Sequence, residues 1–159
     1  MPHNGATTEL HEAIRADDAD ATDRQLRAGA DPDSKDGRGR PALSVAAGLG
    51  QPRLTELLLT AGADPLALDA AMGASALHKA AQSGVVDVAR LLLDHGAFVD
   101  LQAPTHGHTP LIDASWHQRT AMVAFLLERG ADRRRRRAAS TVSRTSASTS
   151  PPPSRVAAS

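Results

Sequence analysis

The chain has 159 residues, enough for one domain, and it contains three aromatic residues and no cysteine. Because so few aromatic side chains cannot fill a usual globular core, leucine, alanine and valine must form it in thin layers. The lack of cysteine excludes disulfides and thiolate metal sites. No stretch approaches the length of a membrane span and no secretory signal is evident, so we expect a cytoplasmic protein that does not enter a membrane.

The formal net charge of zero hides a division between the two ends of the chain. Residues 1–132 carry 11 lysines and arginines against 18 acidic residues, a net charge of −7. Residues 133–159 carry seven arginines and no acidic residue, a net charge of +7. Such an asymmetry indicates an interaction tail.

A pattern of leucine, alanine and glycine recurs four times. Its first leucine recurs at intervals of 33, 34 and 34 residues, and each copy closes with Gly-Ala. A period near 33 with two short helical segments is typical of a solenoid, whose units are stable only when stacked. The recurring residues are Leu10, Leu43, Leu77 and Leu111; Ala13, Ala46, Ala80 and Ala114; Leu26, Leu59, Leu93 and Leu127; and Gly29-Ala30, Gly62-Ala63, Gly96-Ala97 and Gly130-Ala131.

The first copy differs from the others in its second helix and in the turn before it. The segment 19–26 is polar nearly throughout, which is typical of a cap that faces water at the end of a solenoid. Asp17 stands at the turn between the helices, where the third copy has Gly84. The fourth copy has Gln118 there, which tolerates a left-handed backbone poorly, at a cost of about 1 kcal/mol.

The third copy shows the expected helix pair most clearly. Ser75 is a good N-cap for the first helix, because its hydroxyl can accept an otherwise unpaired backbone N–H. Gly84 allows the positive φ of a tight turn. The apolar residues of the segment 85–92 recur at helical spacing, and Gly96 ends the second helix.

The last helix and the segment after it do not follow the pattern of a polar cap. The helix carries more apolar surface than one neighbour can bury, at Met122, Val123, Phe125, Leu126 and Leu127. Three explanations stay open: the tail covers this face, another copy of the chain packs on it, or the end frays. Residues 133–159 are rich in arginine, serine, threonine and proline, and we expect them to be disordered.

The chain resembles the ankyrin-repeat family over about residues 7–132. The opening tetrads are Thr8-Glu9-Leu10-His11, Pro41-Ala42-Leu43-Ser44, Ser75-Ala76-Leu77-His78 and Thr109-Pro110-Leu111-Ile112, close to the family's Thr-Pro-Leu-His. The resemblance implies an all-α solenoid of four helix–turn–helix repeats, joined by extended loops or short β-hairpins. The repeats would span about residues 7–38, 39–72, 73–106 and 107–132, after a disordered N-terminus at residues 1–6. The loops 64–72 and 98–106 are one residue longer than the period allows, so they should bulge.

The resemblance also implies a non-catalytic protein that binds a protein or peptide partner along its concave face. That face would comprise the loop tips and the exposed end of each first helix, where Leu49 also falls. Trp116 is the strongest candidate, since tryptophan is enriched in binding hot spots, although it could instead fold over Gln118 and shield the end of the stack. His11 and His78 would make structural hydrogen bonds between repeats. The expected partner-binding residues are Arg38, Arg40, Met72, Ala74, Gln82, Ser83, His106, His108, Trp116 and His117.

Other kinds of site receive weaker support. His106, His108 and His117 could hold zinc or nickel, but their spacing is more typical of solvated loop histidines. No phosphate loop, nucleophile elbow or cysteine nucleophile is present, so we expect neither catalysis nor a cofactor. An alternative function is binding of nucleic acid or another acidic surface through the basic tail, which could also fold back on the acidic body. Its basic run comprises Arg133, Arg134, Arg135, Arg136 and Arg137.

Overall fold

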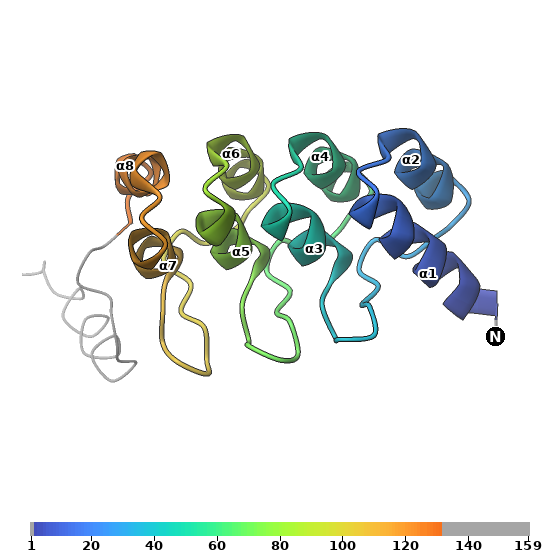
Figure 1. Ribbon diagram of the computed structural model, residues 1–159, viewed down its shortest axis with the longest axis horizontal. Helices are drawn as coiled ribbons and strands as arrows, with labels where there is room; N and C mark the ends of the chain where they lie inside the picture. The colour runs from blue at the N-terminus through green and yellow to red at the C-terminus, as the bar shows by residue number, and fades with distance from the viewer. Residues whose placement is uncertain (1, 132–159) are drawn as a thin grey trace, which may run out of the picture.

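The computed structural model describes residues 2–131 and arranges them as eight α-helices in four antiparallel pairs (Figure 1). Within this range the only β-structure is two isolated bridges, Lys35 with Pro41 and Leu68 with Ser75. The all-α solenoid is therefore confirmed, with loops in place of regular hairpins. No helix in the described residues has the length and apolarity needed to cross a bilayer. The helices are α1 (Pro2–Arg15), α2 (Ala19–Arg27), α3 (Ala42–Gly48), α4 (Pro52–Thr60), α5 (Ala76–Ser83), α6 (Val86–Asp94), α7 (Pro110–Trp116) and α8 (Thr120–Glu128).

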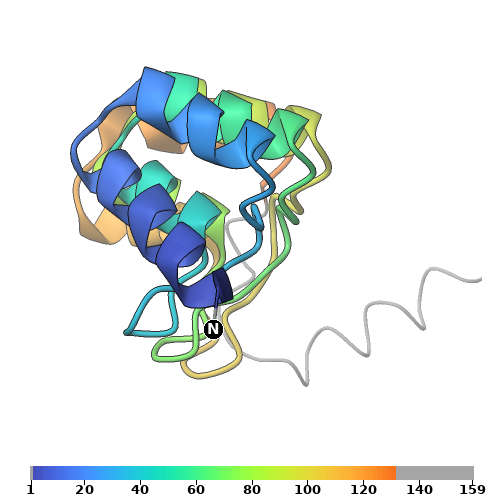
Figure 2. The ribbon, with the colours of Figure 1, turned by 90° about the vertical axis from the view of Figure 1, so that its right-hand side faces the viewer.

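The helices form two layers with the core between them. Figure 2 shows the second helices of the pairs stacked in one layer and the first helices in the other. The repeated leucines Leu10, Leu43, Leu77 and Leu111 are all buried, as are Ala46, Ala80 and Ala114. Alanine at these positions lets neighbouring helices approach closely, so that each repeat buries its leucines against the next one.

The turns between paired helices have the predicted backbone. Gly50 and Gly84 adopt φ of 70° and 80°, and Asp17 and Gln118 adopt φ of 56° and 58° in the corresponding places. The predicted N-cap is also confirmed: Ser75 Oγ accepts the His78 N–H, and the His78 ring accepts the Ser75 N–H in return. Local turn chemistry therefore sets the angle between the helices of each pair.

The two ends of the stack differ from the sequence-based expectation. Helix α1 begins at Pro2, so the prediction of a disordered segment at residues 1–6 is wrong for residues 2–6. Ala6 packs against the core, and the residues on its N-terminal side continue the same helix. At the other end Met122, Phe125 and Leu126 are buried, while Val123 and Leu127 are partly exposed. One neighbour thus buries more of the last helix than predicted.

Candidate functional site

Three loops, here called the fingers, precede the first helices of the second, third and fourth repeats. They comprise residues 36–40, 69–74 and 103–108, and each is closed by a backbone hydrogen bond between its ends, as from the Asp36 N–H to the Arg40 carbonyl oxygen (3.0 Å). In the first finger the Gly39 N–H reaches back three residues, to Asp36. In the others the Gly73 and Gly107 N–H groups reach back four residues. The extra residue predicted for these loops is therefore accommodated at the finger tips.

The fingers stack on one another along the solenoid. The Ala70 N–H donates to the Gly39 carbonyl oxygen at 3.0 Å, and the Thr105 hydroxyl donates to the Met72 carbonyl oxygen. Gly39 has φ of 76°, and a Cβ placed on it would lie 2.6 Å from the Ala70 Cβ. These contacts fix the fingers relative to one another, which lowers the entropy that a partner must remove on binding.

Carboxylates hold the first two fingers to the helices. Asp36 accepts the N–H groups of Arg38 and Arg40 and pairs with the guanidinium groups of Arg40 (2.8 Å) and Arg15 (3.1 Å). Burial alone would raise the pKa of Asp36, but these N–H groups and the Arg40 charge lower it well below its usual 3.8. Asp69 takes the same place in the second finger, where Lys79 lies 3.6 Å away. Arg15, Arg40 and Lys79 are thus already paired.

A buried histidine holds the third finger. Ala103 stands where the other fingers have a carboxylate. The His78 Nδ1 accepts the Ser75 N–H at 3.2 Å, so its proton lies on Nε2, which donates to the His108 carbonyl oxygen at 2.8 Å. Burial lowers the pKa of His78, which keeps the ring neutral in this role. His11 Nε2 lies 3.2 Å from the Ser34 carbonyl oxygen, which belongs to the same repeat, so the predicted bond between repeats is confirmed for His78 and not for His11.

Aromatic rings of the last repeat form a cluster on the same face. The rings of His106 and His108 lie 4.4 Å apart between centroids, and His108 lies 6.5 Å from Trp116. His108 Nδ1 donates to the buried Asp113 carboxylate at 3.3 Å, and Gln82 donates to its other oxygen at 3.1 Å. Trp116 is 77% exposed, so the alternative in which it shields the end of the stack is wrong.

The histidines considered as metal ligands face different groups. His117 Nδ1 donates to the Asp113 carbonyl oxygen at 3.0 Å, and His106 Nδ1 accepts the His108 N–H at 3.4 Å. Among the described residues no group of three or more His, Cys, Asp or Glu side chains is placed to hold a metal ion. The arrangement orients rings at a surface and offers no coordination site.

The structure brings most of the expected partner-binding residues to this face. Arg38, Met72, His106, Trp116 and His117 are exposed, and Arg40, Gln82, Ser83 and His108 are partly exposed. Ala74 is the exception. It is 3% exposed, because its carbonyl oxygen accepts the Asp69 N–H at the base of the second finger and the side chain turns inward. Its assignment as a contact residue is therefore corrected.

One exposed residue was missed by the sequence analysis, and one predicted segment is not covered by the structure. Phe98 is 59% exposed and was not predicted as a site residue. The signal for it was present, because Asp31 and Asp64 occupy the same position after Gly-Ala in the first two repeats. The basic run Arg133–Arg137 lies outside the described residues.

Comparison with known proteins gives consistent matches. A family model described as ankyrin repeats (3 copies) matches residues 10–103 and 43–137. Ankyrin repeat domain-containing protein SAT10 of Stachybotrys chartarum is 38% identical over 127 residues, 80% of this chain. B-cell lymphoma 3 protein homolog of Mus musculus is 32% identical over 133 residues, 82% of this chain. Cyclin-dependent kinase 4 inhibitor B of Homo sapiens is 35% identical over 103 residues, 64% of this chain. The chain spans 6%, 30% and 74% of these three proteins.

Proposed function

We propose that this chain, which belongs to the ankyrin-repeat family, binds a protein or peptide partner along the face formed by its fingers and first helices. Ankyrin repeats are protein–protein interaction modules, and family membership points to a module that is not an enzyme. One matched relative is named as an inhibitor of a kinase, which is itself a protein. We call the surface made by the three fingers and the exposed ends of α3, α5 and α7 the finger face.

The observation that carries this proposal is the position of the exposed apolar side chains. Four large hydrophobic side chains are exposed among the described residues, and three of them lie on the finger face. They are Leu49 (53%) at the end of α3, Met72 (50%) in the second finger and Trp116 (77%) in α7. Each comes from a different part of the stack, so one extended partner segment could cover all three.

The charge of the finger face changes along the stack and favours a particular partner. Arg38 is exposed at the tip of the first finger, with Arg15 and Arg40 nearby. The other end carries Trp116 and the imidazole rings beside it. A partner segment with acidic residues toward the first finger and an apolar or aromatic residue toward Trp116 would match both ends.

The test uses peptides selected for binding to the immobilised full chain from a random-sequence library. Each selected peptide is then titrated against Trp116→Ala and against Arg53→Ala, an exposed residue of α4 outside the finger face. Because truncation of a tryptophan hot spot costs about 2 kcal/mol or more, Trp116→Ala should weaken binding about thirtyfold. Arg53→Ala should leave it unchanged, and both variants should keep the helical circular dichroism of the parent.

A second arm tests the charge of the face. Arg38→Glu should lower the association rate of acidic peptides and reduce the dependence of that rate on salt, with little effect on dissociation. Peptides that bind Trp116→Ala and Arg38→Glu as tightly as the parent would place the interaction elsewhere and overturn the proposal.

A further inference from the structure

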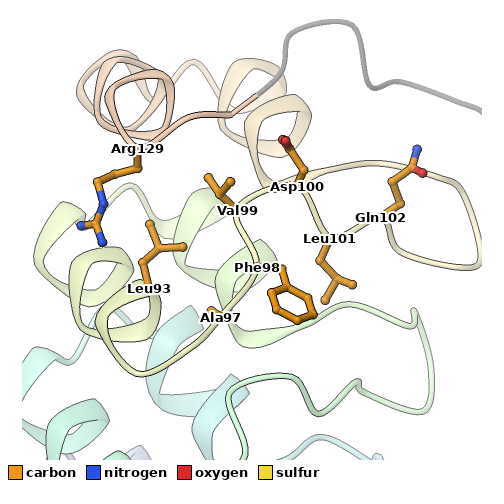
Figure 3. Close-up of a pocket in the computed structure, with 8 residues that line it drawn as sticks. All are labelled: Leu93, Ala97, Phe98, Val99, Asp100, Leu101, Gln102 and Arg129. Carbon is orange, nitrogen blue, oxygen red and sulfur yellow. The ribbon is translucent and has the colours of Figure 1, made fainter. Parts of the chain in front are cut away.

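A groove of about 600 Å³ lies on the loop that links α6 to the third finger (Figure 3). Its lining includes Leu93 of α6, the loop residues Phe98 and Leu101, and Arg129, which follows α8. Figure 3 shows Phe98 and Leu101 side by side and Leu93 close to Arg129. None of its lining residues belongs to the finger face, so this groove is a separate surface.

The linking loops of the solenoid stack in a fixed register. The Asp64 N–H of the second linking loop donates to the Asp33 carboxylate of the first at 2.7 Å. Asp100 in the third loop corresponds to Asp33 in the first, because each is the third residue after Gly-Ala. In the last repeat the position of Asp64 belongs to Asp132. Ala131 is the last described residue, and Asp132 follows it directly in the sequence.

The segment that continues from Ala131 carries charge opposite in sign to that of the linking loops. The linking loops present Asp31, Asp33, Asp64 and Asp100. The guanidinium group that lines the groove, that of Arg129, donates to Asp94 at 3.0 Å and lies 5.5 Å from the centroid of the Phe125 ring. Five consecutive arginines follow Asp132. An exposed phenylalanine ring is a suitable partner for a guanidinium group through cation–π attraction, and a carboxylate of the same loop is one through ionic attraction.

The covalent tether decides which acidic surface the run can reach. Five residues span at most about 17 Å. The carboxylates of the first linking loop are three repeats away, about 27 Å at the usual spacing of packed helices. The groove adjoins the anchor at Ala131, and a tether this short gives an effective concentration in the millimolar range. The run can therefore reach the groove, whereas the first linking loop lies beyond its span.

We propose that the groove is an intramolecular docking site for Arg133–Arg137, with guanidinium groups on Phe98 and opposite Asp100. In this arrangement the run is the polar cap that the C-terminal end of the solenoid otherwise lacks. A nucleic acid or another polyanion must then compete with the groove for the same arginines.

Hydrogen exchange in the full chain tests the docking. In one variant, all five arginines of the run are changed to glutamine. The backbone amides of residues 99–103 should exchange about fivefold faster in this variant than in the parent at low salt. The difference should disappear at about 1 M salt, where the Debye length is about 3 Å. Residues 66–68, which lie in the preceding loop, are the internal control and should exchange equally in both proteins.

A variant of the groove gives an independent readout. Phe98→Ala should accelerate exchange in the same loop and should increase the retention of a single-stranded 20-nucleotide DNA probe about threefold at low salt, because released arginines bind phosphates. Phe98 is exposed, so the substitution should not unfold the stack. Equal exchange in the parent and the five-glutamine variant would overturn the docking. So would DNA retention that Phe98→Ala leaves unchanged, since the run would then already be free.

Discussion

Acidification should destabilise the solenoid in a step that belongs to two buried histidines. His78 joins the third repeat to the fourth, and His11 joins α1 to the loop of its own repeat, each through a hydrogen bond to a carbonyl oxygen. Burial lowers the pKa of both side chains below the usual 6.5. The unfolded chain therefore takes up a proton at each site at a pH where the folded chain does not. The free energy of unfolding should be constant well above pH 6.5 and should fall as the pH drops below it.

The size of this effect has a limit set by the number of protons. One histidine that is protonated only in the unfolded state changes the free energy of unfolding by at most about 1.4 kcal/mol per pH unit. Two such histidines give at most about 2.7 kcal/mol per pH unit. Asp36 acts in a different range, because its pKa is lowered: its contribution is present above pH 3.8 and is lost only as the pH falls below that value.

Urea denaturation followed by circular dichroism at several values between about pH 8 and pH 4.5 measures the slope directly. His78→Gln should lower stability at about pH 8 by about 0.5–1.5 kcal/mol, because the His108 carbonyl oxygen loses the His78 donor and keeps only the Ala103 N–H. It should also reduce the acid slope to that of His11 alone. His11→Gln is the matched variant at the other end of the stack. A parent protein of constant stability between about pH 7.5 and pH 5, or an unchanged slope in the double variant, would refute this explanation.

Three further substitutions test the packing. Gln118→Gly should raise the free energy of unfolding by about 0.5–1 kcal/mol in urea denaturation, because glycine removes the strain of a left-handed backbone. The greater conformational entropy of glycine in the unfolded chain offsets part of this gain. A loss of stability would contradict the prediction. Gly50→Ala should cost at least about 1 kcal/mol in the same assay, because a Cβ would lie 2.8 Å from a methyl group of Val85. Leu77→Ala should lower the free energy of unfolding by about 2–5 kcal/mol, because Leu77 is buried. Trp116→Ala should change it by less than about 0.5 kcal/mol, because Trp116 is exposed. Thermal unfolding measures both, and an equal loss of stability in the two variants would mean that Trp116 has a structural role.

The sequence predicted the fold through positions that each repeat must share. Leu10 and its counterparts recur because every repeat buries the same side chain against its neighbour, and this constraint is visible without coordinates. The left-handed backbone at Asp17 and Gln118 was also predictable, because a turn at a fixed place in the period dictates φ whatever residue stands there. The start of α1 was not predictable in this way, since the recurring positions begin at Leu10 and carry no information about residues 2–6.

The candidate site was less predictable, because a period identifies a position but not the direction of its side chain. Ala74 and Met72 lie two residues apart in one finger, yet one is buried and the other exposed. The extra residue in that finger changes how the tip folds back, and the period does not show where it is inserted. Trp116 had two possible orientations, and only its exposure in the structure distinguishes them. Phe98 could be identified from the sequence only because it replaces the aspartate that the first two repeats have at the same position.

For the proposed binding at the finger face, the departures from the repeat pattern predict which part of that face contributes most. At the first two fingers Asp36 and Asp69 are paired with cations from the helices, so a partner's carboxylate must compete with an existing ion pair and gains little net free energy. Ala103 replaces that carboxylate in the third finger, and the exposed ring of Trp116 has no comparable competitor. Burial of that ring would add its full apolar area to the complex. The basic end should therefore set the association rate and orientation of the partner, and the aromatic end should set how long it stays bound.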